Sequence, residues 1–137
     1  MTEASILIAH GDDIARSALE MLLQQEPCLR VPGTAANGQE LLHLAASNRP
    51  DVVLLDGHLP GPSAAELVAA LRTVDERIKV IALISRPEQR QVVQQAGVHG
   101  VIDLWDPPRK VLTAILAVLC EEGRHVALPL QLDETGE

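Results

Sequence analysis

The sequence predicts an α/β fold: a doubly wound, five-stranded parallel sheet flanked by five helices. The first observation is that strand-like and helix-like segments alternate five times along the chain, with short connections between them. The second is the length of 137 residues, which suits one domain. The third is the composition: 47% of the residues are hydrophobic, but only 1% are aromatic. The core must therefore consist of Leu, Val, Ile and Ala, as in aliphatic strands covered by alanine-rich helices.

The strands are predicted from short apolar runs, which are typical of buried parallel strands. The second run is the weakest because Pro32 and Gly33 interrupt it. An edge position tolerates such an interruption, so we expect this strand at an edge of the sheet. In chain order, the expected strands are Ser5–Ala9, Leu29–Ala35, Asp51–Asp56, Ile78–Ile84 and Gly100–Leu104.

The helices are predicted from the apolar periodicity and from their start and stop signals. Asp12 is suited to cap the first helix, and Asn37 with Gly38 to open the second. Gly97 and Gly123 are expected to end the fourth and fifth helices. The expected helices are Asp12–Gln25, Gly38–Ser47, Ser63–Arg72, Pro87–Ala96 and Pro107–Glu122.

In parallel sheets of this kind, ligands and chemistry gather at the carboxyl ends of the strands. The most informative residue there is Asp56, which ends the apolar run of the third strand. The residues expected at the same edge are His10, Gly11, Asp12, Asp13, Gly57, His58, Ser85, Arg86, Leu104 and Trp105.

Composition limits the classes of function. The net charge of −8 gives no basic footprint, so this chain alone is not expected to bind DNA. Cys28 and Cys120 are far apart and form no Cys-x-x-Cys pair, which is typical of reduced thiols. No signal peptide is visible, and the longest apolar helical stretch is too short to span a bilayer. We therefore expect a cytoplasmic protein without a membrane partner.

Four motifs, in order, resemble those of response-regulator receiver domains. Asp51-Val-Val-Leu-Leu-Asp56-Gly-His-Leu-Pro60 is similar to the phosphoacceptor strand and its proline turn, and Ser63-Ala-Ala-Glu66-Leu67 follows at the expected distance. Val80-Ile-Ala-Leu-Ile-Ser85 resembles the strand that ends in the switch hydroxyl, and Gln95-Ala-Gly97-Val-His-Gly100 precedes the last strand. The resemblance covers Ala4 to about Leu128 and implies a flavodoxin-like fold of the receiver type. Asp106-Pro107-Pro108 is similar to the NarL/FixJ branch, as is the segment from Gly123 to Pro129.

The resemblance implies that Asp56 is the phosphoacceptor or its vestige, but the neighbouring positions depart from the family. His10 and Gly11 stand where an acidic pair binds Mg²⁺, and Leu104 stands in place of the lysine. Asp12 and Asp13 are acidic but lie two positions late. With few fixed cations, Asp56 is expected to react very slowly with a phosphoryl donor. Arg86 is the expected partner of Asp56.

The last helix carries the strongest interaction signal. It is apolar nearly all round, whereas a surface helix needs only one apolar stripe. We expect a two-fold dimer through this helix, with Val111, Ile115, Val118 and Leu119 at the interface. A competing interpretation is that Val126–Leu132 of the tail, or a C-terminal module, covers the helix. The predicted organisation is a receiver domain over residues 1–124, followed by an acidic tail or linker over 125–137.

The sequence is thus identified as an atypical receiver domain of NarL/FixJ type. We expect it to act without phosphorylation, to dimerise, and to regulate transcription through a C-terminal helix-turn-helix module. It is expected to have no enzymatic activity, no cofactor and no resident metal, and a histidine kinase is a doubtful partner. One alternative is a conventional phosphoacceptor, with Mg²⁺ held by a displaced Asp12 or Asp13. Another is a small-molecule or cofactor-binding module at the His10 and His58 end of the sheet, where Asp56 could join the two imidazoles around a transition metal.

Overall fold

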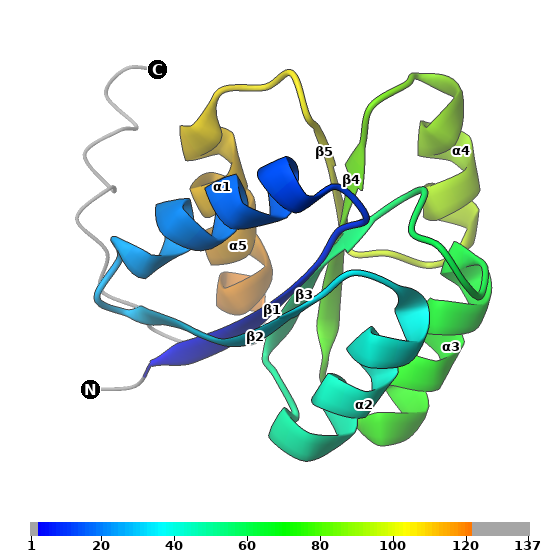
Figure 1. Ribbon diagram of the computed structural model, residues 1–137, viewed down its shortest axis with the longest axis horizontal. Helices are drawn as coiled ribbons and strands as arrows, with labels where there is room; N and C mark the ends of the chain where they lie inside the picture. Colours follow the sequence, from blue (N-terminus) through cyan, green and yellow to red (C-terminus); the bar gives the residue numbers. More distant parts are fainter. Residues whose placement is uncertain (1–2, 122–137) are drawn as a thin grey trace.

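The computed structural model describes residues 3–121 and has the predicted fold: five parallel strands in the order β2-β1-β3-β4-β5, with five helices (Figure 1). The strands are β1 (Ala4–Ala9), β2 (Leu29–Ala35), β3 (Val52–Asp56), β4 (Lys79–Ile84) and β5 (Gly100–Asp103). The helices are α1 (Asp13–Gln24), α2 (Gly38–Asn48), α3 (Ala64–Val74), α4 (Glu88–Gln95) and α5 (Pro108–Glu121). Each differs from its predicted bounds by no more than two residues at either end.

The sheet divides the core into two layers. Helices α1 and α5 cover one face, and α2, α3 and α4 cover the other (Figure 1). Leu19 and Leu23 of α1 and Ile115 of α5 pack against alternate residues of β1 and β3. On the opposite face, leucines of α2 and α3 pack against the remaining residues of these strands. The central strands are buried on both faces, which explains why their sequences are continuous apolar runs.

Strand β2 lies at an edge of the sheet, as predicted. Its pairing with β1 is irregular, since Ser5 pairs with Arg30 but Leu7 pairs with Gly33. One extra residue of β2 is therefore accommodated around Pro32, which has no N–H to donate to the sheet. The irregularity stays at the periphery and leaves the pairing of β1 with β3 unbroken.

The helix ends follow the predicted signals. Asp12 accepts a hydrogen bond from Ala15 N at 2.9 Å, and Asn37 accepts one from Glu40 N at 2.9 Å. Ser63 and Glu66 form a capping box at the start of α3. Gly97 follows α4 with φ +92°, a conformation that glycine adopts at little cost. The predicted stop at Gly123, the domain boundary at residue 124 and the tail over 125–137 lie outside the described residues.

The assignment of four α5 residues to a dimer interface was wrong. The side chains of Val111, Ile115, Val118 and Leu119 are all buried within the protomer. They recur at helical spacing and form the stripe that packs on the sheet. Around this stripe, Thr113 and Ala117 are exposed and Leu116 is half-buried. An interface on α5 would have to use this outward side.

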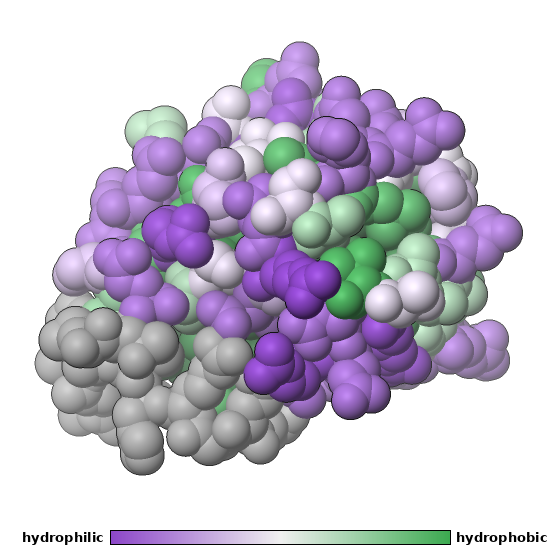
Figure 2. Space-filling model, turned by 90° about the horizontal axis from the view of Figure 1, so that it is seen from below, coloured by the Kyte–Doolittle hydropathy of each residue, from purple (hydrophilic) through white to green (hydrophobic). Residues whose placement is uncertain are grey.

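Most other large apolar side chains are inside the domain. Seen from below, the surface is mainly hydrophilic, and hydrophobic residues form only a limited area (Figure 2). Within residues 3–121, no helix is both long enough and apolar enough to span a bilayer.

The orientation of α5 is testable with two neighbouring residues. Ile115→Ala leaves a hole in the core and should lower the free energy of unfolding by about 2–5 kcal/mol. Leu116→Ala, at a half-buried position, should cost clearly less. Urea unfolding of both variants measures the difference. Equal losses for the two variants would contradict the orientation described.

Candidate functional site at the end of the third strand

The strand register brings the candidate residues to one edge of the sheet. Ala9 pairs with Leu55, and Asp56 pairs with Leu83, so the ends of β1, β3 and β4 lie side by side. The Asp56 side chain is only 14% exposed. A Cβ placed at Gly11 would lie 3.7 Å from Asp56 Oδ2 and 3.1 Å from Pro60 Cδ. Position 11 therefore faces the carboxylate directly.

Both Asp56 carboxylate oxygens accept backbone hydrogen bonds. Gly11 N donates to Oδ2 at 3.2 Å, and His58 N donates to Oδ1 at 2.9 Å. Such donors hold the carboxylate in place and stabilise its negative charge without supplying a cation. These contacts could not be predicted from the sequence, because a backbone N–H is common to almost all residue types and leaves no sequence signal.

His10 is the side chain nearest to Asp56, but the geometry is not that of a salt bridge. Its Nδ1 accepts a hydrogen bond from Asp12 N at 3.0 Å and lies 3.6 Å from Asp56 Oδ2. An Nδ1 that accepts from Asp12 carries no proton, and 3.6 Å is too long for a hydrogen bond. We infer a neutral imidazole protonated at Nε2. That nitrogen is buried and has no hydrogen-bond partner within residues 3–121.

The two acidic residues at the start of α1 make contacts within this helix and its cap. Asp12 caps α1 through Ala15 N, and Asp13 is paired with Arg16, whose guanidinium also donates to His10 O at 2.8 Å. Neither carboxylate is directed to Asp56 by these contacts. The hypothesis of a displaced Asp12 or Asp13 that holds Mg²⁺ therefore gains no geometric support.

Arg86 does not pair with Asp56, contrary to the sequence-based expectation. No ion pair joins the two residues in the described part of the chain. The backbone N–H groups of Arg86 and Ser85 donate to Gln89 Oε1, at 3.1 and 2.8 Å, as does the Ser85 hydroxyl at 3.4 Å. These contacts fix the start of α4, while the Arg86 side chain is exposed.

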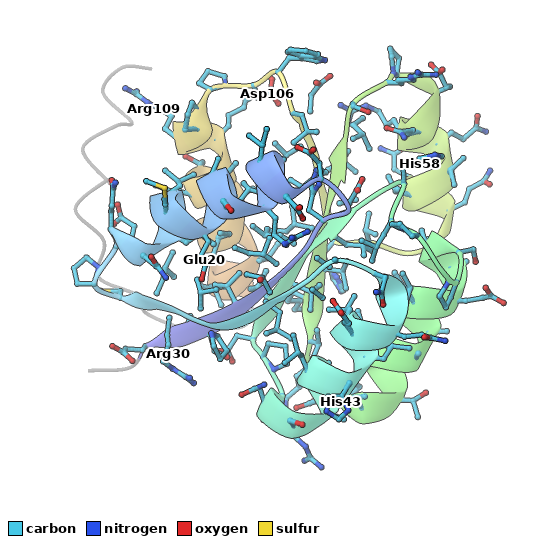
Figure 3. All side chains as sticks on the ribbon, viewed as in Figure 1. Glu20, Arg30, His43, His58, Asp106 and Arg109 are labelled. Carbon is cyan, nitrogen blue, oxygen red and sulfur yellow. The ribbon has the colours of Figure 1, made fainter. Side chains whose placement is uncertain are left out.

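The donor set at this edge does not fit Mg²⁺. Mg²⁺ is usually held by more than one hard oxygen ligand, and among residues 3–121 Asp56 is the one acidic residue that lines its cavity. A transition-metal site of His10, His58 and Asp56 is not formed either. Figure 3 shows His58 on the α4 side of the molecule. Across residues 3–121, no group of three His, Cys, Asp or Glu side chains is arranged to hold a metal ion.

Four of the predicted site residues line two separate cavities, and the other five line neither of them: His10, Gly11, Asp12, Asp13 and Arg86. Asp56 and His58 line one of 450 Å³, between the β3–α3 loop and Val92 of α4. Ser85 and Leu104 line a larger one of 660 Å³ beside α1. Leu104 therefore contributes an apolar wall to a different cavity from that of Asp56.

A five-stranded parallel sheet with an aspartate at the end of its central strand is the arrangement found in receiver domains. Residues 6–108 match the family model described as "Response regulator receiver domain". The chain belongs to this family.

Curated relatives include transcriptional regulators. The chain is 27% identical to the transcriptional regulatory protein DesR of Bacillus subtilis over 130 residues, which cover 95% of this chain and 64% of DesR. It is 29% identical to the nitrate/nitrite response regulator protein NarL of Escherichia coli, over 82% of this chain and 53% of NarL. A protein-glutamate methylesterase/protein-glutamine glutaminase of Methanosarcina acetivorans is 29% identical over 85% of this chain and 33% of that protein. The chain thus spans between a third and two-thirds of the length of these relatives.

Solved structures agree on the fold. A LuxR-family response regulator from Aurantimonas superposes with a TM-score of 0.79 at 25% identity, covering 93% of this chain and 91% of that one. The NarL receiver domain of Mycobacterium tuberculosis gives a TM-score of 0.79 at 24% identity, covering 90% and 100%.

The protonation of His10 provides a direct test of the site geometry. We expect Nδ1 to carry no proton, because it accepts from Asp12 N. Long-range ¹H–¹⁵N spectra of histidine-labelled protein distinguish the two tautomers and the imidazolium. A proton on Nδ1 would contradict this geometry and would indicate a true hydrogen bond to Asp56.

Proposed function

We propose that this receiver domain acts without phosphorylation and regulates transcription through a DNA-binding module elsewhere in a longer polypeptide. The observation that carries the proposal is the environment of Asp56. Its carboxylate is held by two backbone N–H groups, and the nearest imidazole, that of His10, lies 3.6 Å away and forms no hydrogen bond with it. In the described part of the chain, no lysine or arginine forms an ion pair with it.

Charge explains why this environment disfavours phosphoryl transfer. The transferred group carries negative charge on its oxygens, and catalysis of this reaction is largely positioning and electrostatic stabilisation. In receiver domains, according to the resemblance, a metal held by an acidic pair and a lysine supply the positive charge. Here His10, Gly11 and Leu104 occupy those positions. Asp56 would therefore have to react with little compensation for the added charge.

The proposed output rests on the relatives. DesR is named as a transcriptional regulatory protein and NarL as a response regulator, and both extend well beyond the part matched by this chain. We propose that DNA binding belongs to such an additional module, since the chain itself has a net charge of −8. We also propose that the receiver catalyses no reaction of its own, although one relative is named as an enzyme. A histidine kinase is then not required for the output.

Dimerisation through the outward side of α5 is part of this proposal. The inward stripe is used by the core, yet Leu116 and Ala117 still place apolar surface on the other side. Two copies related by a two-fold axis would bury this surface against itself.

The conventional alternative, phosphorylation of Asp56, makes the opposite prediction. Our proposal predicts that the intact mass of the chain stays unchanged with acetyl phosphate and Mg²⁺, because the negative charge added to Asp56 would be little compensated. Electrospray mass spectrometry after an hour of incubation checks this. Addition of one phosphoryl group to the wild type, absent in Asp56→Asn, would support the alternative and overturn the proposal.

The dimer can be tested with one charge on α5. The wild-type chain should sediment as a dimer at micromolar concentration, and Leu116→Glu should sediment as a monomer because it places a charge in the interface. Val92→Glu, at an exposed apolar residue of α4, serves as a control and should remain dimeric. A wild-type monomer at high concentration would refute dimerisation.

A further inference from the structure

One cavity of the described domain lies beside α1, away from Asp56. It has a volume of 660 Å³ and separates α1 from the β5–α5 segment. One wall is formed by Ala18, Met21 and Leu22 of α1, and the other by Leu104 and Trp105. Pockets that bind small organic molecules typically have volumes of about 300–1,000 Å³. Its size is therefore that of a ligand site.

The cavity is apolar, and its rim is exposed. Met21 is 64% exposed and Trp105 is 83% exposed, although large apolar side chains are normally buried. Leu104 makes this wall of the cavity apolar. By the family resemblance, Leu104 occupies the position at which receiver domains carry a lysine. An apolar occupant would cover the side chains on the rim and gain the free energy of removing them from water.

The charged groups that line the cavity are all acidic in the part of the chain that the structure describes: Asp103 and Asp106. Asp103 Oδ1 accepts from Trp105 N at 2.9 Å, and Asp106 Oδ2 accepts from Asp103 N at 3.2 Å. Lys110 Nζ lies 3.9 Å from the same Asp106 oxygen. One oxygen of each carboxylate takes no hydrogen bond within residues 3–121. Figure 3 shows Asp106 above α5, on the segment that leads into this helix.

We propose that this cavity binds a small apolar molecule that carries an ammonium group. The apolar body fills the space between α1 and Leu104, and the ammonium group pairs with Asp103 and Asp106. Trp105, at the rim between the two acids, adds a cation–π contact and covers the ligand. This site is separate from Asp56 and does not depend on whether Asp56 accepts a phosphoryl group.

The chain contains its own reporter for the test, because Trp105 is its one tryptophan and it has no tyrosine. The probes are 1-adamantanemethylamine, the neutral 1-adamantanemethanol and the anionic 1-adamantanecarboxylate, which share one apolar body. We expect a saturable change of Trp105 emission with the amine. The alcohol should bind about tenfold more weakly, as expected for the loss of ~1.4 kcal/mol, and the carboxylate more weakly still. Equal affinities for all three probes, or no saturable binding of the amine, would overturn the proposal.

Two variants locate the binding in the cavity. Ala18→Phe fills the space from an exposed position of α1 and should abolish binding of the amine. Ser17→Phe adds the same ring at the neighbouring exposed position, which does not line the cavity, and should leave binding unchanged. Circular dichroism shows whether both variants remain folded. Equal binding by both would place the amine elsewhere and overturn the proposal.

Asp106→Asn tests the charge, because the amide keeps an oxygen acceptor for Asp103 N. It should lower the affinity for the amine about tenfold and leave that for the alcohol unchanged. A second copy of the chain is the competing occupant. If wild-type Trp105 is already shielded and Ala18→Phe both exposes it and converts a dimer into monomers, the cavity is a dimer interface and the ligand proposal is wrong.

Discussion

The pairing of β1 with β3 is the constraint on which the site depends. These central strands run parallel in unbroken register, so they end at the same edge and place position 11 directly opposite Asp56. The hydrogen bonds from Gly11 N and His58 N then fix the carboxylate. Because both strands are buried on either face, the core anchors the position of Asp56, and the loops that follow β1 and β3 supply the two donors.

The same geometry that keeps Asp56 in place pairs it with no lysine or arginine among residues 3–121. His10 comes closest, but it uses Nδ1 to accept from Asp12 N and is best described as neutral. Asp12 caps α1, while Asp13 pairs with Arg16. The receiver fold is thus retained, whereas we propose that Asp56 lacks the positive charge that phosphoryl transfer requires. We propose that dimerisation, or a ligand beside α1, sets the conformation of this receiver in place of phosphorylation.

The fold was predictable because its signals are local and repeated. Apolar runs mark the buried strands, and caps such as Asp12, Asn37 and Ser63 mark the helix starts. Even the edge position of β2 followed from Pro32, whose missing N–H limits where a strand can lie.

The side-chain partners were less predictable. Arg86 was expected at Asp56 from its position in the chain, but Gln89 binds the backbone at the start of α4 and the arginine faces outward. On α5, apolar residues all round the helix concealed which stripe faces the sheet, so buried core residues such as Ile115 were assigned to an interface. The cavity beside α1 joins residues from four elements, and no sequence motif marks such a juxtaposition.

Introducing the acidic pair and the lysine most directly tests the claim that the surroundings of Asp56 prevent its phosphorylation. The triple variant His10→Asp, Gly11→Asp, Leu104→Lys should gain one phosphoryl group from acetyl phosphate and Mg²⁺, detected by intact-mass spectrometry and lost on further substitution Asp56→Asn. The wild type, treated in parallel, should gain none. Pro60 Cδ would have to move by a few tenths of an ångström to admit the new side chain at position 11, so circular dichroism should accompany the assay. If the wild type is phosphorylated on Asp56 as fast as the triple variant, the environment of Asp56 does not limit its chemistry and the account is wrong.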